Sequence, residues 1–190
     1  MPSNAYVVHF RQLLQDAFEL VDAHSRLRTG ARGRQYRLAA LNRAVVVISV
    51  SAWESYIEEL MRECLSVLRP PAPPLHPWPA LNAYVLGLLG RFNTPNSSNV
   101  TTLINNCLGL ANISLQWVWT MCTSAQATQR LDDALTYRHE IAHGVNPRPV
   151  IHNTYSSSLP LFFRRLAACT DTAVRTHLVT TLGVASPWPP

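Results

Sequence analysis

Residues 137–144, which read YRHEIAHG, gather one arginine, one glutamate and two histidines in a chain of which only 14% of the residues are charged. Two patterns overlap in this stretch. Arg138 and His143 form Arg-x4-His, which is typical of metal-independent RNA cleavage, whereas His139 and His143 end the pattern His-Glu-x-x-His, which is typical of zinc metalloproteases. The two patterns require different surroundings, so the rest of the chain must decide between them.

A catalytic zinc site needs a third protein ligand at a defined distance beyond the two histidines. The chain lacks the His-x-x-Gly-x-x-His extension, and no glutamate follows Glu140. His152 or Asp171 could serve only at an unusual spacing. The zinc helix also continues past its second histidine, whereas Gly144 predicts that this helix stops. A metalloprotease is therefore a remote alternative, and we expect no metal and no cofactor.

Cleavage at an Arg-x4-His site needs no metal, because the 2′-hydroxyl of RNA can itself attack the adjacent phosphate. The products are a 2′,3′-cyclic phosphate and a 5′-hydroxyl. We expect His143 to transfer the proton near neutral pH. We expect Arg138 to hold the scissile phosphate with two donors and to stabilise its growing charge. His139 is expected to support the site as a polar neighbour.

Two apolar stripes predict how the motif is positioned. Residues 35–68 contain no proline or glycine and are apolar on nearly all sides, which predicts a long central helix. Glu54 lies on the apolar stripe of that helix, and Arg138 lies on the apolar stripe of its own helix. A carboxylate and a guanidinium in such places each need a partner. We therefore predict that Glu54 pairs with Arg138 and orients it.

The remaining sequence predicts further helices joined by loops, which gives an all-α fold of five to seven helices without strands. Gly144, Pro147 and Pro149 end the motif's helix. Trp117 and Trp119 are predicted to pack in the core. Besides the central helix, the predicted helices span residues 6–27, 81–92, 100–108 with Ser97 or Ser98 as its cap, 124–143, and 158–182.

Length and composition predict one domain, because 190 residues with 47% hydrophobic content suit a single core. We place this domain at residues 1–183 and a flexible tail at 184–190. The apolar runs are far shorter than the roughly 20 residues that cross a bilayer, and no secretory signal is visible. We therefore expect a cytoplasmic protein without a membrane span. The four cysteines lack a Cys-x-x-Cys pair and are expected to be buried structural thiols.

The positive charge of the chain, +5 net, is carried entirely by arginine, because the sequence contains no lysine. Guanidinium groups suit contacts with phosphates and bases, so this charge permits RNA binding. Arg32, Arg34 and Arg37 lie in or beside a glycine-containing segment between two predicted helices. This segment is either a solvated loop or a weak RNA-binding patch.

Three segments together resemble one known family. They are WESYIEEL at residues 53–60, FNTPNS at residues 92–97 and RHEIAHG at residues 138–144. With this combination the chain resembles the HEPN superfamily of all-helical ribonuclease-like domains, and most closely its RiboL-PSP-HEPN branch. Arg138, the polar residue His139 and His143 match the three motif positions of that family. Glu54 matches its acidic residue on the central helix.

The resemblance implies a HEPN-like helical bundle with a long central helix and additional short helices. It also implies an endoribonuclease that acts on RNA as a homodimer, with two Arg-x4-His motifs facing one cleft. A toxin or defence role is implied as well, with an antitoxin or other regulatory protein as a partner. The alternative is a non-catalytic HEPN-like module that binds RNA or nucleotides, or that serves dimerisation.

Overall fold

The computed structural model describes residues 1–28, 36–71, 77–145, 147 and 149–188, and this part of the chain is helical without β-strands. The elements are η1 (Ala5–Phe10, a π-helix), α1 (Arg11–Leu27), α2 (Tyr36–Leu68), α3 (Trp78–Leu89), α4 (Ser97–Leu108), η2 (Ile113–Gln116, a 3-10 helix), α5 (Ser124–Ala142) and α6 (Asn153–Thr180). The predicted all-α fold is confirmed. Among the described helices, none is both long and apolar enough to span a membrane.

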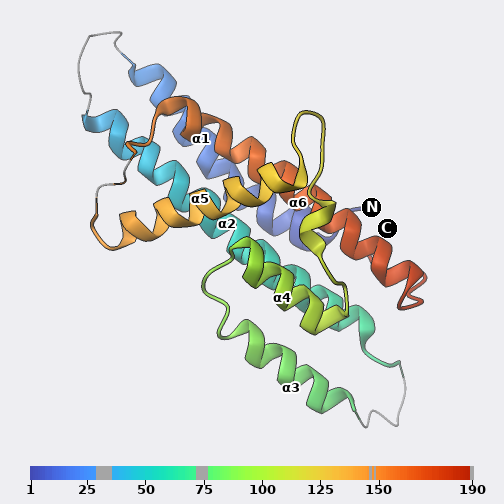
Figure 1. Cartoon of the computed structure of the whole chain (residues 1–190). Coiled ribbons are helices and arrows are strands. Elements are labelled where there is room, and N and C mark those ends of the chain that lie inside the picture. The colour runs from blue at the N-terminus through green and yellow to red at the C-terminus, as the bar shows by residue number, and fades with distance from the viewer. Residues whose placement is uncertain (29–35, 72–76, 146, 148, 189–190) are drawn as a thin grey trace.

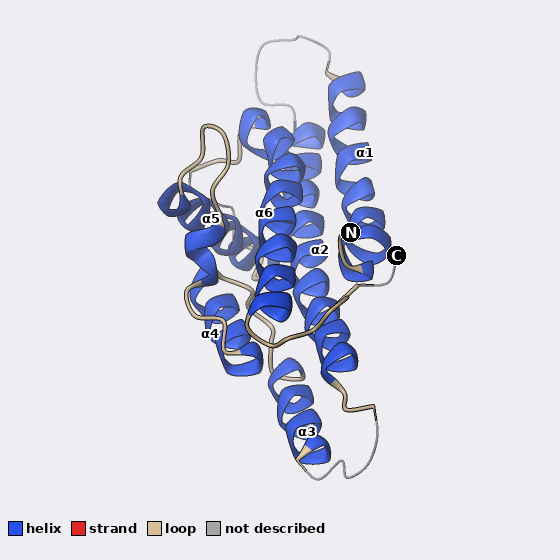
Figure 2. Ribbon diagram, turned by 90° about the vertical axis from the view of Figure 1, so that its right-hand side faces the viewer, coloured by secondary structure: helices blue, strands red, loops and turns tan. Residues whose placement is uncertain are grey.

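Helix α2 is the longest element and the centre of the fold. It is apolar on nearly every side, and Val46, Val50, Ile57 and Leu60 are completely buried. Helices α1 and α6 lie alongside it, and α5 crosses it (Figure 1). In the view turned by 90°, α1, α2 and α6 form the long part of the bundle, while α3 lies at its far end (Figure 2). The central helix expected from the sequence thus contacts the helix that carries the motif.

Aromatic side chains fill the core where α2 meets α6 and the segment before α5. The centroid of the Trp53 ring lies 6.2 Å from that of Trp117 and 6.2 Å from that of Phe163. Trp117 is fully buried, and its indole N–H donates to the Thr170 hydroxyl at 2.9 Å. The predicted core position of Trp117 is confirmed, whereas Trp119 is half-buried.

The first residues of the chain are fastened to the bundle by two carboxylates. Asp171 of α6 is only 3% exposed, and it accepts hydrogen bonds from the Ser3 hydroxyl and the Ser3 backbone N–H. Glu63 of α2 accepts from the backbone N–H groups of Asn4 and Ala5, both at 3.0 Å. Burial raises the pKa of Asp171, against the hydrogen bonds from Ser3, which lower it. The sequence did not reveal this buried cluster.

The last helix begins earlier than predicted. We expected it to open at residues 158–160, but α6 begins at Asn153 and contains Pro160. Proline inside a helix removes one backbone hydrogen bond and disfavours this arrangement. Within the first turn of α6, the buried Ser156 hydroxyl donates to the Asn42 side chain of α2 at 2.8 Å. This tertiary hydrogen bond ties the added turn to the central helix, a contact that the local sequence does not reveal.

The cap of α4 also differs from the prediction. We expected Ser97 or Ser98 to cap this helix, but Asn96 does so, because its side chain accepts from the Asn99 backbone N–H at 2.7 Å. Ser97 instead donates to Asp132 of α5 from both its backbone N–H and its hydroxyl. The serine thus joins two helices rather than ending one.

The end of the chain packs against the bundle. We predicted a flexible tail at residues 184–190, but Pro187 is buried and Trp188 is only 3% exposed within the core. Burial at Pro187 and Trp188 does not fit a flexible tail there, whereas Ala185 and Ser186 are exposed and residues 189–190 lie outside the described part. A large indole with apolar neighbours stabilises such packing.

The cysteine prediction holds in part. All four are free thiols, but only Cys64 is buried, while Cys107, Cys122 and Cys169 are half-buried. Burial raises the pKa of Cys107 to about 11, which keeps this thiol protonated and unreactive at neutral pH.

Candidate functional site

Helix α5 carries the motif and has well-formed ends. At its start, the side chains of Thr123 and Gln126 each accept from the other's backbone N–H, which makes a capping box. At its end, Gly144 has φ 71° and donates its N–H one turn back, while the Val145 N–H donates to the Glu140 carbonyl at 2.9 Å. These bonds form a Schellman motif. The predicted stop at Gly144 is confirmed.

The predicted pair of Glu54 and Arg138 is present where α5 crosses α2. The guanidinium Nη2 atom of Arg138 lies 3.8 Å from the Glu54 Oε2 atom, and the two side chains are 34% and 18% exposed. Burial raises the pKa of Glu54, while Arg138 lowers it and Glu58 raises it. The pair is long and partly exposed, so Glu54 lies beside the guanidinium without removing it from solvent.

A turn at residues 93–97 is fastened to both helices of this ion pair. The Trp53 indole N–H of α2 donates to the Pro95 carbonyl at 3.0 Å. Asp132 of α5 accepts from the Ser97 backbone N–H at 2.8 Å and from its hydroxyl at 2.7 Å. The two anchors lie one residue before the glutamate and six residues before the arginine. Sequence reasoning missed Asp132, because its partner Ser97 lies 35 positions away in the chain and leaves no local signal.

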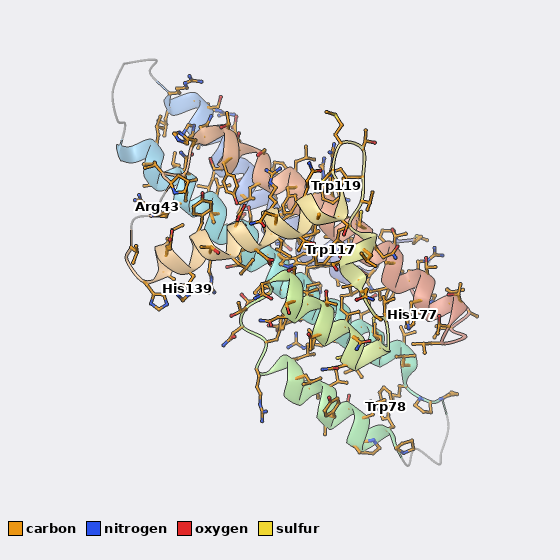
Figure 3. All side chains as sticks on the ribbon, in the orientation of Figure 1. Arg43, Trp78, Trp117, Trp119, His139 and His177 are labelled. Carbon is orange, nitrogen blue, oxygen red and sulfur yellow. The ribbon has the colours of Figure 1, made fainter. Side chains whose placement is uncertain are left out.

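His139 and His143 form a second pair at the exposed end of α5. Their ring centroids lie 4.3 Å apart at 58°, because residues four positions apart share one helix face. His143 has φ −90° and ψ 11°, which places it at the cap after the last helical residue. Both side chains are exposed, and Figure 3 shows His139 at the outer end of the helix.

The structure joins these residues into two pairs rather than one cluster. Arg138 contacts Glu54, and His139 contacts His143. Positions 138 and 143 lie about 140° apart around a regular helix, because each residue turns it by about 100°. A regular helix would therefore direct the Arg138 and His143 side chains to different sides. The predicted RNA-binding patch of Arg32, Arg34 and Arg37 falls outside the described residues and side chains.

The geometry does not fit a catalytic zinc site. Within the described ranges, no group of three histidine, cysteine or acidic side chains is placed to hold a metal ion. The Oε2 atom of Glu140 is buried, whereas both imidazoles are exposed. A zinc protease needs both a third ligand and a glutamate beside the metal-bound water.

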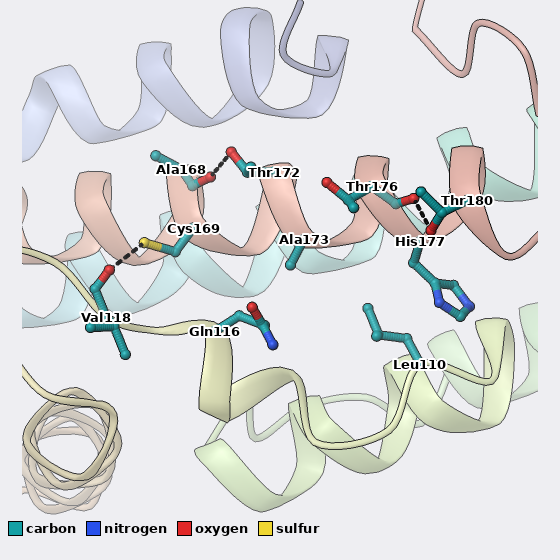
Figure 4. A pocket seen from close by; sticks show the side chains of 10 residues that line it. All are labelled: Leu110, Gln116, Val118, Ala168, Cys169, Thr172, Ala173, Thr176, His177 and Thr180. Atoms are coloured by element: carbon teal, nitrogen blue, oxygen red, sulfur yellow. Dashed lines mark hydrogen bonds between the residues drawn. The ribbon is translucent and has the colours of Figure 1, made fainter.

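A large hollow of about 550 Å³ lies away from the motif, between α6 and the segment that follows α4 (Figure 4). Its walls are mainly threonines and small apolar side chains, and no arginine or acidic residue lines it. His177 borders it, but a ring nitrogen of His177 lies 2.9 Å from the Leu108 carbonyl and is held there. This hollow has no cation to hold a phosphate.

An all-helical bundle whose central helix pairs a glutamate with the arginine of an Arg-x4-His motif has the features of a HEPN domain. The chain belongs to the RiboL-PSP-HEPN family, whose family model matches residues 12–175. The matched span includes Glu54 and the whole motif, which confirms the resemblance seen in the sequence. Comparisons with curated proteins and with solved structures gave no match. The family suggests a ribonuclease or a nucleotide-binding module, with RNA interaction and often dimers.

Proposed function

We propose that this protein is a metal-independent endoribonuclease. The observation that carries the proposal is the half-exposed Arg138 guanidinium, directed by Glu54 and placed on the helix that ends in two exposed imidazoles. In the proposed reaction, the 2′-hydroxyl loses its proton and attacks the adjacent phosphorus. The bond from phosphorus to the 5′-oxygen breaks, and that oxygen takes up a proton. The products are a 2′,3′-cyclic phosphate and a 5′-hydroxyl.

Each residue has a distinct role in this proposal. His143 takes or gives the proton, because imidazole can do both near neutral pH. Arg138 binds the scissile phosphate with two parallel N–H donors and stabilises the charge of the transition state. Glu54 is a positioning residue that keeps the guanidinium fork in one direction. His139 supports the site through its contact with the His143 ring.

We further propose that the complete site forms between two copies of the chain. The two pairs diverge around α5 within one chain, so a single phosphate cannot easily contact both. A homodimer related by a two-fold axis brings the arginine of one copy opposite the imidazole of the other. Such an enzyme would act on cellular RNA in the cytoplasm, as a toxin or defence effector restrained by a regulatory partner.

A cleavage assay tests the chemistry. Purified protein is incubated with a labelled single-stranded RNA in EDTA, and the products are examined for 2′,3′-cyclic phosphate and 5′-hydroxyl ends. We expect cleavage by the wild type, about 10²-fold or greater loss in His143→Ala, and no loss in His9→Ala, a matched exposed histidine on η1. Cleavage only with added zinc, or hydrolysis of casein, would contradict the proposal.

Mixing two inactive variants tests the shared site. Arg138→Gln and His143→Ala chains are unfolded together and refolded, so that mixed dimers form. A site built from two chains is intact once in each mixed dimer, so about a quarter of the wild-type activity returns. No recovery from two variants that each form dimers would place the whole site within one chain.

A second candidate function is a non-catalytic module that binds RNA or nucleotides. It is favoured by one observation: in the single chain Arg138 pairs with Glu54, whereas His143 contacts His139. The two functions differ in the cleavage assay, because a binding module would retain RNA on a filter without producing cyclic phosphate ends.

A further inference from the structure

Arg130, in the first half of α5, has an unusually apolar environment for a cationic side chain. Its guanidinium carbon is 4.8 Å from the centre of the Phe162 ring and 5.8 Å from that of Tyr155. Its Nη2 atom donates to the Ser158 hydroxyl at 2.6 Å. Burial lowers the pKa of Arg130, whereas Tyr155 and Cys122 raise it. The guanidinium is thus partly desolvated, and aromatic faces rather than a carboxylate surround it.

No carboxylate in the described part of the chain lies within 4.0 Å of Arg130 or of Arg165, the exposed arginine of α6 nearby. A partly desolvated charge without a counter-ion is unfavourable, so an anion that reaches it gains a strong interaction. Arginine has five N–H donors, and a single hydroxyl cannot accept from all of them. Donors therefore remain for a ligand.

Both arginines border one hollow of about 480 Å³ between the turn at residues 119–122, the first turns of α5 and the middle of α6. Burial raises the pKa of the Cys122 thiol in this hollow, while Arg130 and Arg165 each lower it. The guanidinium groups of Arg130 and Arg165 therefore both lie close enough to influence the Cys122 thiol. The raised pKa also keeps the thiol protonated, so the hollow is not suited to thiolate chemistry.

Aromatic rings supply the rest of the lining. Trp119 is half-buried, and its ring centroid lies 5.9 Å from that of Phe162. Part of the indole thus faces the hollow, where a planar group can contact it. The volume falls within the roughly 300–1,000 Å³ of small-molecule sites. Neither Arg138 nor His143 lines this hollow.

We propose that this hollow binds a phosphomonoester carried by a nucleotide, with Arg130 and Arg165 holding the phosphate and Trp119 contacting the base. A phosphomonoester carries close to two negative charges at pH 7, which matches two guanidinium groups. A phosphodiester carries one charge and matches them less well. The nucleotide is either free in solution or the phosphorylated end of an RNA. The site does not depend on the proposed cleavage chemistry.

Titration calorimetry on the full chain tests the site with AMP, adenosine and inorganic phosphate. We expect AMP to bind at least about tenfold more tightly than adenosine, because only AMP satisfies the charges. Arg165→Gln should weaken AMP binding by about tenfold or more, and its exposed position keeps the fold unchanged. The matched control is Arg164→Gln, the neighbouring exposed arginine outside the hollow, which should bind AMP as the wild type does.

A second titration separates the two sources of the phosphate. A short 2′-O-methyl oligonucleotide is not a substrate for 2′-hydroxyl attack, and it is compared with and without a 5′-phosphate. Tighter binding of the phosphorylated oligonucleotide than of AMP identifies an RNA end, and the reverse identifies a free nucleotide. Equal binding of adenosine and AMP, wild-type AMP affinity in Arg165→Gln, or no binding of either phosphorylated probe at millimolar concentration would overturn the proposal. These titrations involve no cleavage, so their failure is distinct from failure of the ribonuclease proposal.

Discussion

Helix α5 carries two half-buried arginines with different surroundings, and only Arg138 has a carboxylate within 4.0 Å in the described part of the chain. Arg138 faces Glu54 at 3.8 Å, whereas Arg130 faces the Phe162 ring and the Ser158 hydroxyl. A guanidinium beside a carboxylate has part of its charge balanced, so we expect it to hold a reacting phosphate less tightly. A guanidinium among aromatic rings has no carboxylate to balance its charge, so we expect it to bind an anion more tightly. The same residue type thus suits two different tasks on one helix.

The largest expected effect separates the two arginines by RNA cleavage. Arg138→Gln should lower the cleavage rate by about 10²- to 10³-fold, because loss of a donor to the transition-state charge has effects of this size. The rate is measured with saturating single-stranded RNA in EDTA. Arg164→Gln serves as the control that keeps full activity, since this exposed arginine lies outside both sites.

The cleavage rate of Arg130→Gln decides whether the two arginines have different functions. Arg130→Gln removes a cation from the same helix but from a different hollow. An equally large loss of cleavage in Arg130→Gln would show that the two ends of α5 form one functional surface.

Stability should rank the two arginines in the opposite order. Arg130→Ala removes a cation–π contact and a hydrogen bond from a partly buried position, and we expect it to lower the free energy of unfolding by about 2 kcal/mol. Arg138→Ala removes a long, partly exposed ion pair, which contributes about 1 kcal/mol or less. Urea denaturation followed by circular dichroism measures both. A larger loss in Arg138→Ala would mean that Glu54 is costly to leave alone and that the pair is mainly structural.

Two glycine substitutions test whether RNA cleavage requires the present backbone conformation at the C-terminal end of α5. Gly144 and Gly109 both end helices with positive φ, 71° and 72°, and a Cβ atom at either would meet nothing within 4 Å. Alanine at each should therefore cost a similar backbone strain of about 1 kcal/mol. Only Gly144→Ala should also lower RNA cleavage, because it displaces His143. Equal cleavage by the two variants would show that the position of His143 is not critical.

The surroundings of Arg138 are largely predictable from the sequence. The apolar periodicity of residues 35–68 predicts the central helix, because a helix buried on most sides must be apolar on most sides. The pair of Glu54 and Arg138 is predictable for the same reason, since each charge interrupts an apolar stripe. Gly144 predicts the helix end through its conformational freedom. These features all rest on local pattern.

The features that the sequence does not predict depend on contacts between distant segments. The Ser3 and Asp171 hydrogen bonds and the burial of Trp188 leave no periodic signal. The hollow at Arg130 was missed because its partners are a hydroxyl and rings, which carry no opposite charge to suggest a pairing. The direction of His143 relative to Arg138 follows from the exact end of a helix, which periodicity gives only to within a few residues.

The smallest effect tests whether Arg138, and not Arg130, acts on the glutamate. Burial raises the pKa of Glu54, so the folded chain holds this proton more tightly than the unfolded chain does. Its contribution therefore lowers the free energy of unfolding as the pH rises from the ordinary glutamate value of 4.5 through the raised pKa, and it is constant above that. Glu54→Gln abolishes this fall in the free energy of unfolding, and urea denaturation from pH 4 to pH 8 measures the difference from the wild type.

The same pH series in an Arg138→Gln background tests the pairing. The fall in the free energy of unfolding should move to higher pH, because the group that lowers the Glu54 pKa is gone. An identical move in an Arg130→Gln background would refute the specific pairing, since a charge at the far end of α5 would then influence Glu54 as strongly as its neighbour does.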